Sequence, residues 1–139
     1  MARDTIITSI REFLESCPVI QERIKLESLG EDTPEYCVET VPCNPVIKEY
    51  VDGSAKKQYL FVFAGREVFG DDIDNLTNSE FYESVAEWIE DQDCIGNLPQ
   101  LGGKLEAQSL TVLTNGYVFA NDETKARYQI QCRLTYYKP

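Results

Sequence analysis

The sequence predicts an α+β fold, with a mostly antiparallel sheet of about four to five strands and two main helices packed on it. Two segments carry apolar residues every three to four positions, which is the spacing of an amphipathic helix. Several other segments alternate apolar and polar residues with a period of two, as strands with one buried face do. The 139 residues contain no linker, repeat or low-complexity tract, so we expect one domain over residues 1–139.

The first helix is predicted over about Asp4–Ser16. Its apolar side is formed by Ile6, Ile7, Ile10, Phe13 and Leu14. Asp4 or Thr5 is placed to cap its amino end, and Pro18 stops it.

The next three segments predict short strands. Ile24–Leu26 reads as a brief strand, and Glu35–Val41 alternates until two prolines break it, as expected near a sheet edge. Val46–Val51 is either a short strand or a turn of helix, and it is closed by the turn residues 52–54. Lys57–Ala64 is apolar on both faces, which indicates a central strand, or one covered by helices or a neighbouring subunit.

The second helix is predicted over about Ser79–Asp91, after a loop that reaches Asn78. Thr77 and Glu80 have the spacing of a capping box, in which each side chain satisfies a free amide at the helix start. Its apolar stripe is Phe81, Val85, Trp88 and Ile89. The glycines and proline that follow, between residues 96 and 103, predict a surface loop.

The C-terminal part predicts paired strands. Asn115-Gly116 is a hairpin signal inside the strand pattern of Leu105–Ala120. The turn residues 121–124 offer a second place for the reversal, so we favour one long strand with a bulge at Gly116 that turns at 121–124 onto a final strand. The choice sets the register of the sheet.

The final strand, Ala126–Tyr137, has two chemically different faces. Tyr128, Ile130, Cys132, Leu134 and Tyr136 form the apolar face. Arg127, Gln129, Gln131, Arg133 and Thr135 form the other, whose amides and guanidiniums suit hydrogen bonding to a protein surface better than catalysis. We therefore expect this polar face to be a surface for assembly with other proteins.

The charge balance limits the partners. Thirteen basic residues against twenty-four acidic ones give a net charge of −11. This charge opposes counterion release, so we expect no specific nucleic-acid binding. An acidic surface suits a passage through which DNA slides without adhering, because like charges repel.

The cysteines and the hydropathy indicate a reducing cytoplasm. The five cysteines show no metal-binding spacing, and we expect Cys37 and Cys43 to be reduced, although they could bridge in oxidising conditions. No run approaches the roughly 20 apolar residues that span a bilayer, and the N-terminus lacks the apolar core of a signal peptide. We expect no membrane association.

Catalytic chemistry has little support. The chain contains no histidine, which nearly excludes a hydrolase triad, and its glycines form no nucleotide-binding motif. We therefore expect no enzymatic activity, no catalytic residue and no cofactor. The acidic residues 71–74 fail the EF-hand pattern, since Thr77 stands where glycine is required, and a helix amino end explains them; a cation site is the alternative.

A resemblance extends over nearly the whole chain. The motifs that carry it are Cys17-Pro18, Pro42-x-Asn44-Pro45-x-Ile47-Lys48-x-Tyr50-x-Asp52-Gly53, Gln58-Tyr59-x-Phe61-Val62-Phe63-Ala64-x-Arg66-Glu67-x-Phe69-Gly70, Asn78-Ser79-x-Phe81-Tyr82-Glu83, Trp88-Ile89-Glu90, Gly96-Asn97-Leu98-Pro99, Gly116-Tyr117-x-Phe119 and Ala126-Arg127-Tyr128-Gln129-Ile130-Gln131-x-Arg133-Leu134. In this order and spacing, the chain resembles the minor capsid or tail-terminator-like proteins of siphophages and prophages of Gram-positive bacteria.

The resemblance implies a structural role in phage morphogenesis. It implies an α+β subunit of a homo-oligomeric ring, expected to be hexameric, that caps the tail tube and provides the head-tail joining surface. The implied partners are the tail tube protein and a neck or head-completion protein, and the implied location is the host cytoplasm during assembly and then the virion. The alternatives are another neck or head-completion connector, or an assembly chaperone.

A ring subunit needs two different surfaces that bind each other. Arg66 and Glu67, which follow the doubly apolar strand, form either a structural ion pair or a subunit contact. The candidate interface residues are Arg66, Glu67, Arg127, Gln129, Gln131 and Arg133.

Overall fold

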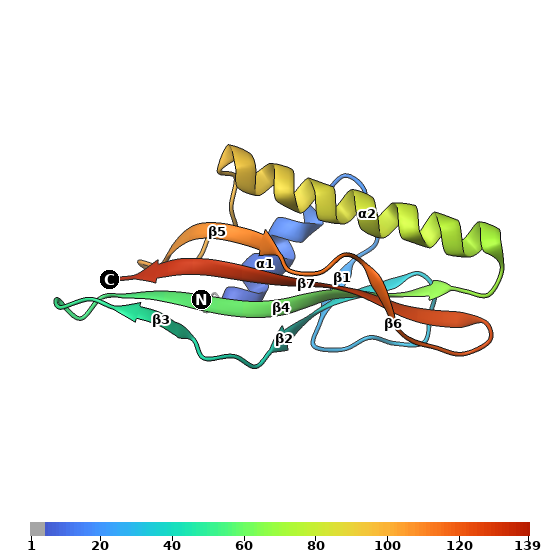
Figure 1. The fold of residues 1–139 in the computed structure, drawn as a ribbon, viewed down its shortest axis with the longest axis horizontal. Coiled ribbons are helices and arrows are strands. Elements are labelled where there is room, and N and C mark those ends of the chain that lie inside the picture. Colours follow the sequence, from blue (N-terminus) through green and yellow to red (C-terminus); the bar gives the residue numbers. More distant parts are fainter. Residues whose placement is uncertain (1–4) are drawn as a thin grey trace.

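The computed structural model describes residues 5–139, which form one mixed sheet and two helices (Figure 1). The helices are α1 (Ile6–Glu15) and α2 (Asp72–Ile95). The strands are β1 (Ile24–Leu26), β2 (Glu35–Val41), β3 (Val46–Glu49), β4 (Ala55–Val68), β5 (Glu106–Val112), β6 (Tyr117–Asn121) and β7 (Lys125–Lys138). The class is α+β, but the expected antiparallel sheet of four to five strands is wrong. The sheet is 7-stranded and mixed, because β1 runs parallel to β2.

The centre of the sheet is the pair β4 and β7, two strands of 14 residues that pair along their whole length. β2 and β3 pair one after the other with the edge of β4 that faces away from β7. β5 and β6 pair in the same way with the outer edge of β7. The chain leaves the sheet at residues 42–45 and again at 113–116. Each outer position is therefore filled by two strands in succession, which raises the strand count without widening the sheet.

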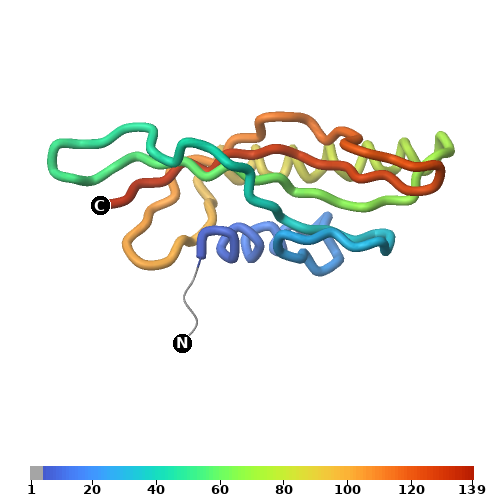
Figure 2. The backbone as a smooth tube through the Cα atoms, turned by 90° about the horizontal axis from the view of Figure 1, so that it is seen from below, coloured from blue at the N-terminus to red at the C-terminus, as the bar shows by residue number. Residues whose placement is uncertain are grey.

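Both helices pack on the same face of the sheet. Phe61, Ile130 and Leu134 are fully buried on that face, in one core with the apolar sides of α1 and α2. The helices touch each other where the rings of Phe13 and Trp88 lie 5.0 Å apart between centroids. In Figure 2, α2 lies behind the strands. The opposite face consequently carries no helix in the part of the chain that the structure describes.

Helix α2 begins at Asp72, well before the predicted Ser79. Asp71 is its N-cap, and its carboxylate accepts a hydrogen bond of 2.8 Å from the amide of Asp74. The predicted capping box at Thr77 therefore lies inside the helix and caps nothing. The first turns were missed because their apolar side chains point into solvent and add nothing to the buried stripe.

The expected single strand with a bulge at Gly116 is wrong, because β5 ends at Val112 and β6 begins at Tyr117. Gly116 instead lies against α2, where an added Cβ atom would be 2.4 Å from the Cβ of Tyr82. The predicted turn at 121–124 is confirmed. The carboxylate of Asp122 accepts hydrogen bonds from two following backbone amides at 2.8 Å, and β6 pairs antiparallel with β7.

The N-terminal helix follows the sequence closely. Thr5 caps α1, its hydroxyl accepting a hydrogen bond of 3.3 Å from the amide of Thr8. The alternative cap, Asp4, lies outside the described residues. Within residues 5–139, no helix combines the length and apolar character needed to cross a membrane.

Candidate subunit interface

The sheet face that carries no helix, called the open face below, holds most of the candidate interface residues. It is formed by the even-numbered residues 56–66 of β4, the odd-numbered residues 125–135 of β7 and their cross-strand neighbours on the other strands. Val62, Ala64 and Gln129 on this face are nearly or fully buried although no helix covers them. Longer polar side chains around them shield them from solvent.

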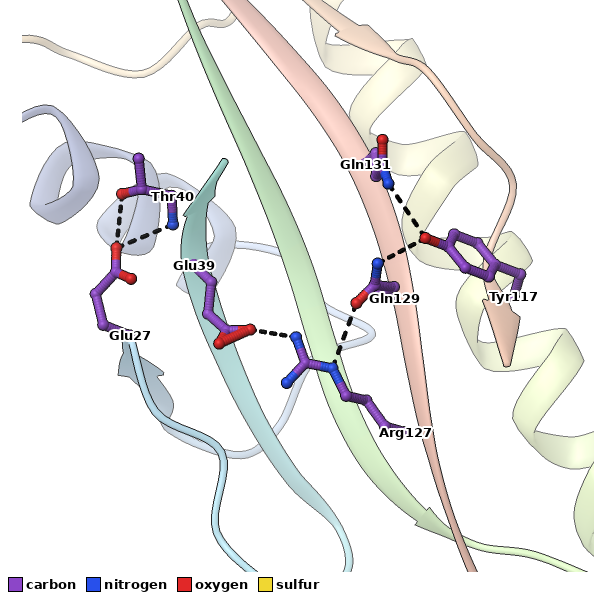
Figure 3. A network of polar contacts seen from close by, with 7 residues as sticks. All are labelled: Glu27, Glu39, Thr40, Tyr117, Arg127, Gln129 and Gln131. Carbon is purple, nitrogen blue, oxygen red and sulfur yellow. Dashed lines mark hydrogen bonds and ion pairs between the residues drawn. The ribbon is translucent and has the colours of Figure 1, made fainter. Parts of the chain in front are cut away.

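These polar side chains form a continuous network across three strands (Figure 3). The Arg127 guanidinium makes an ion pair with Glu39 of β2 and donates to the Gln129 side-chain oxygen at 3.3 Å. The Gln129 amide donates to the Tyr117 hydroxyl at 2.6 Å, and Gln131 donates to the same hydroxyl at 3.2 Å. The guanidinium also lies 5.3 Å from the centroid of the Phe119 ring. The network fixes the orientation of three candidate residues.

The ion pair between Arg127 and Glu39 can form across β4 because small side chains lie in the cross-strand row between them. Cys37 and Ala64 are paired in that row, and both are fully buried. Burial, aided by the nearby Glu39 carboxylate, raises the pKa of the Cys37 thiol to about 12. The structure records no disulfide between Cys37 and Cys43.

Arg66 and Glu67 do not form the ion pair considered from the sequence, because consecutive strand residues point to opposite faces. Arg66 pairs in register with Arg127 on the open face. The two cations avoid each other, since Arg66 turns to donate to the backbone oxygen of Gly30 at 2.6 Å. Arg66 thereby holds the loop before β2 against the end of the sheet.

Glu67 lies on the helix side, apart from the other five candidates. It is 9% exposed and accepts a hydrogen bond of 2.8 Å from the Tyr82 hydroxyl. Burial raises the pKa of the Glu67 carboxyl, and hydrogen bonds from Tyr82 and Tyr36 only partly offset this effect. Within the subunit, Glu67 is a core residue.

Arg133 is the candidate without an internal partner. It lies between Leu60 of β4 and Thr111 of β5 in the sheet register. Its Nε atom is buried and has no hydrogen-bond partner among residues 5–139. A buried guanidinium nitrogen left unpaired costs free energy, and no ion pair among residues 5–139 neutralises the Arg133 charge, so the guanidinium is suited to a carboxylate supplied from outside the subunit.

Two residues of the network were not identified from the sequence. Glu39 was read only as a polar position of an edge strand, and Tyr117 as part of a long strand. Their roles follow from the register, which brings Glu39 within reach of a residue 88 positions later. Alternation in the sequence shows which residues of one strand share a face with Glu39 or with Arg127. It does not show that these two faces lie on the same side of the sheet.

The acidic residues 71–74 are part of the helix start. Asp71 caps α2, and the carboxylate of Asp71 lies close to that of Asp74. Burial, and then this neighbouring charge, raise the pKa of Asp74. In residues 5–139, no group of three or more Cys, Asp or Glu side chains is arranged to hold a metal ion.

A scan of the sequence against protein-family models found no match, and a search of curated proteins found no match.

Proposed function

We propose that this protein is a structural subunit of a phage tail, a ring-forming tail terminator that caps the tail tube and provides the head-tail joining surface. It acts by assembly and not as an enzyme. Its partners are further copies of itself, the tail tube protein and a neck or head-completion protein. It assembles in the host cytoplasm and is carried into the virion.

The observation that carries the proposal is the open face. A sheet face without a helix that is nevertheless dry at its centre, organised by a polar network and left with an unpaired buried Arg133 Nε atom, is suited to a protein neighbour. The network holds Arg127, Gln129 and Gln131 in fixed positions before a partner arrives, which reduces the entropy lost on binding.

The resemblance to tail-terminator-like proteins supplies the biological context. It covers nearly the whole chain, and its motifs include the open-face segment of β7. The net charge of −11 supports the same role, since an acidic ring repels the DNA that passes through its lumen.

Self-association is the first test. Sedimentation velocity and mass photometry over a wide concentration range, followed by negative-stain imaging, are expected to detect a closed ring. The ring is expected to form more readily when purified tail tubes are added. A protein that remains monomeric at high concentration, with and without tubes, contradicts the proposal.

The position in the particle separates the terminator from its alternatives. Immunogold labelling of phage tails made without heads is expected to mark the head-proximal tip of the tube. Label on heads that lack tails indicates a head-completion connector. Absence from both particles, with binding to free tube protein, indicates an assembly chaperone.

A further inference from the structure

We infer that the open face binds the acidic side of α2 in the next copy of this chain, so that subunits join head to tail. The inference rests on the proposed function, because it names the two surfaces that meet in the ring. Four observations lead to it.

The first observation is the charge of α2. The helix contains Asp and Glu residues along its whole length and no Lys or Arg. Five exposed carboxylates define what we call the acidic stripe: Glu80, Glu83, Glu87, Glu90 and Asp91. At about 100° per residue they share one side of the helix, away from the buried Tyr82 and Ile89. Neighbours three or four positions apart repel one another, and a cationic partner would relieve this repulsion.

The second observation is the opposite balance on the open face. Its basic side chains are Lys25, Lys48, Lys56, Arg66, Lys125, Arg127 and Arg133. Its carboxylates are only Glu35, Glu39 and Glu106. Two of these carboxylates are already neutralised by Lys25 and Arg127. In a chain with a net charge of −11, this face is therefore locally positive.

The third observation is the shape of the acidic stripe. A hollow of about 270 Å³ lies between α2 and the segment that separates β5 from β6. It is lined by Glu83, Glu87 and Glu90 together with Asn115 and Gly116. Three carboxylates around a hollow of this size match a guanidinium or ammonium group of a neighbouring subunit.

The fourth observation is the set of unfilled donors on the open face. The Arg133 guanidinium takes part in no ion pair in the described part of the chain, and its Nε atom is buried without a hydrogen-bond partner. The Tyr117 hydroxyl accepts two hydrogen bonds, so its own proton is free to be donated. Both groups require acceptors, and the acidic stripe offers only acceptors.

The two surfaces belong to different parts of the subunit, since the open face is formed by strands and the stripe lies on the side of α2 turned away from its buried residues. No ion pair among residues 5–139 joins the two surfaces. Their contact is heterologous, and such a contact generates a closed ring when the rotation between subunits closes.

Charge exchange tests the inference. Arg133→Glu on the open face and Glu87→Arg on the acidic stripe are each expected to raise the concentration for half-assembly by about tenfold or more. An equimolar mixture of the two variants is expected to assemble again. The two variants must then alternate, because each contact between neighbours joins either the two unchanged residues or the two exchanged ones. The double variant R133E/E87R is expected to assemble alone. Raising the ionic strength from about 0.05 M to about 0.5 M is expected to weaken wild-type assembly.

Matched controls make the same changes of charge elsewhere. Glu12→Arg and Arg23→Glu lie at exposed positions near α1 and are expected to leave assembly unchanged. Circular dichroism verifies the folding of every variant. If R133E fails to fold, Lys56→Glu paired with Glu90→Lys repeats the exchange at positions that have no buried unpaired nitrogen or oxygen.

The outcomes separate the two proposals. Wild-type protein that assembles, with single variants unaffected or with no recovery on mixing, overturns this inference and leaves the ring proposal standing. Wild-type protein that never assembles, even with tail tubes, overturns both. Loss of tube binding by R133E without loss of self-association assigns the open face to the tube protein instead, and overturns the inference.

Discussion

Glu67 is a single core residue whose ionisation lowers the stability of the fold. Its carboxyl is buried beside the Tyr82 hydroxyl, and burial raises its pKa above the usual 4.5. A folded-state pKa above the unfolded one means that the folded protein holds the proton more tightly. The associated stabilisation is complete below about pH 4.5 and is lost as the pH rises through the folded-state value.

Glu67→Gln removes this ionisation while keeping the shape of the side chain. The difference in unfolding free energy between E67Q and the wild type is expected to shift in favour of the variant as the pH rises from 4.5 to neutrality. Urea denaturation at several pH values measures this shift, with Glu12→Gln at an exposed position as the matched control. A difference that does not change with pH contradicts the prediction.

Gly65 is a second position where one atom decides stability. A Cβ atom there would lie 1.9 Å from the Tyr82 hydroxyl oxygen and 2.7 Å from the Tyr36 ring. Gly65→Ala is therefore expected to destabilise the fold by about 1–3 kcal/mol, since the rings must shift. Thermal unfolding measures the loss, and Ser79→Ala on the exposed side of α2 is expected to change little.

At the level of the element, the start of α2 distinguishes the predicted cap from the observed one. Asp71→Ala removes the acceptor of the Asp74 amide and is expected to cost about 1 kcal/mol. Thr77→Ala is expected to be neutral or slightly stabilising, because Thr77 is an exposed interior position of the helix and alanine is a better helix former. Equal losses of stability in the two variants would contradict this prediction and indicate that the helix begins near Ser79.

The elements also show what periodicity can and cannot predict. Phe81 and Trp88 of the expected α2 stripe are only partly buried. Its other members, Val85 and Ile89, and the two faces of β7 were predicted correctly, because burial imposes a period that the sequence displays. The first turns of α2 were not, since exposed residues such as Ile73 and Leu76 have no buried face to mark. The break before β6 was also missed, because Gly116 serves helix packing and not a turn.

At the level of the whole molecule, the sequence did not predict which distant segments pair in the sheet or in which register. The alternation in β7 placed Arg127, Gln129 and Gln131 on one face, and they do lie together. Nothing in the sequence indicated that Glu39 would neutralise Arg127 or that Glu67 would point into the core. Those facts depend on the registers of β2, β4 and β7, which a single sequence does not define.

The pairing of β4 with β7 also governs how the chain folds. Ala55 is opposite Lys138 and Val68 is opposite Lys125, so the middle of the sheet closes over a long intervening segment that includes α2. Non-local pairing of this kind folds slowly, because the loop entropy is lost before the contacts form. During synthesis, β2, β3 and β4 leave the ribosome before β7, so the backbone hydrogen-bonding groups on one edge of β4 have no partner until β7 emerges. The nascent chain is thus exposed to aggregation for the time needed to translate residues 69–138.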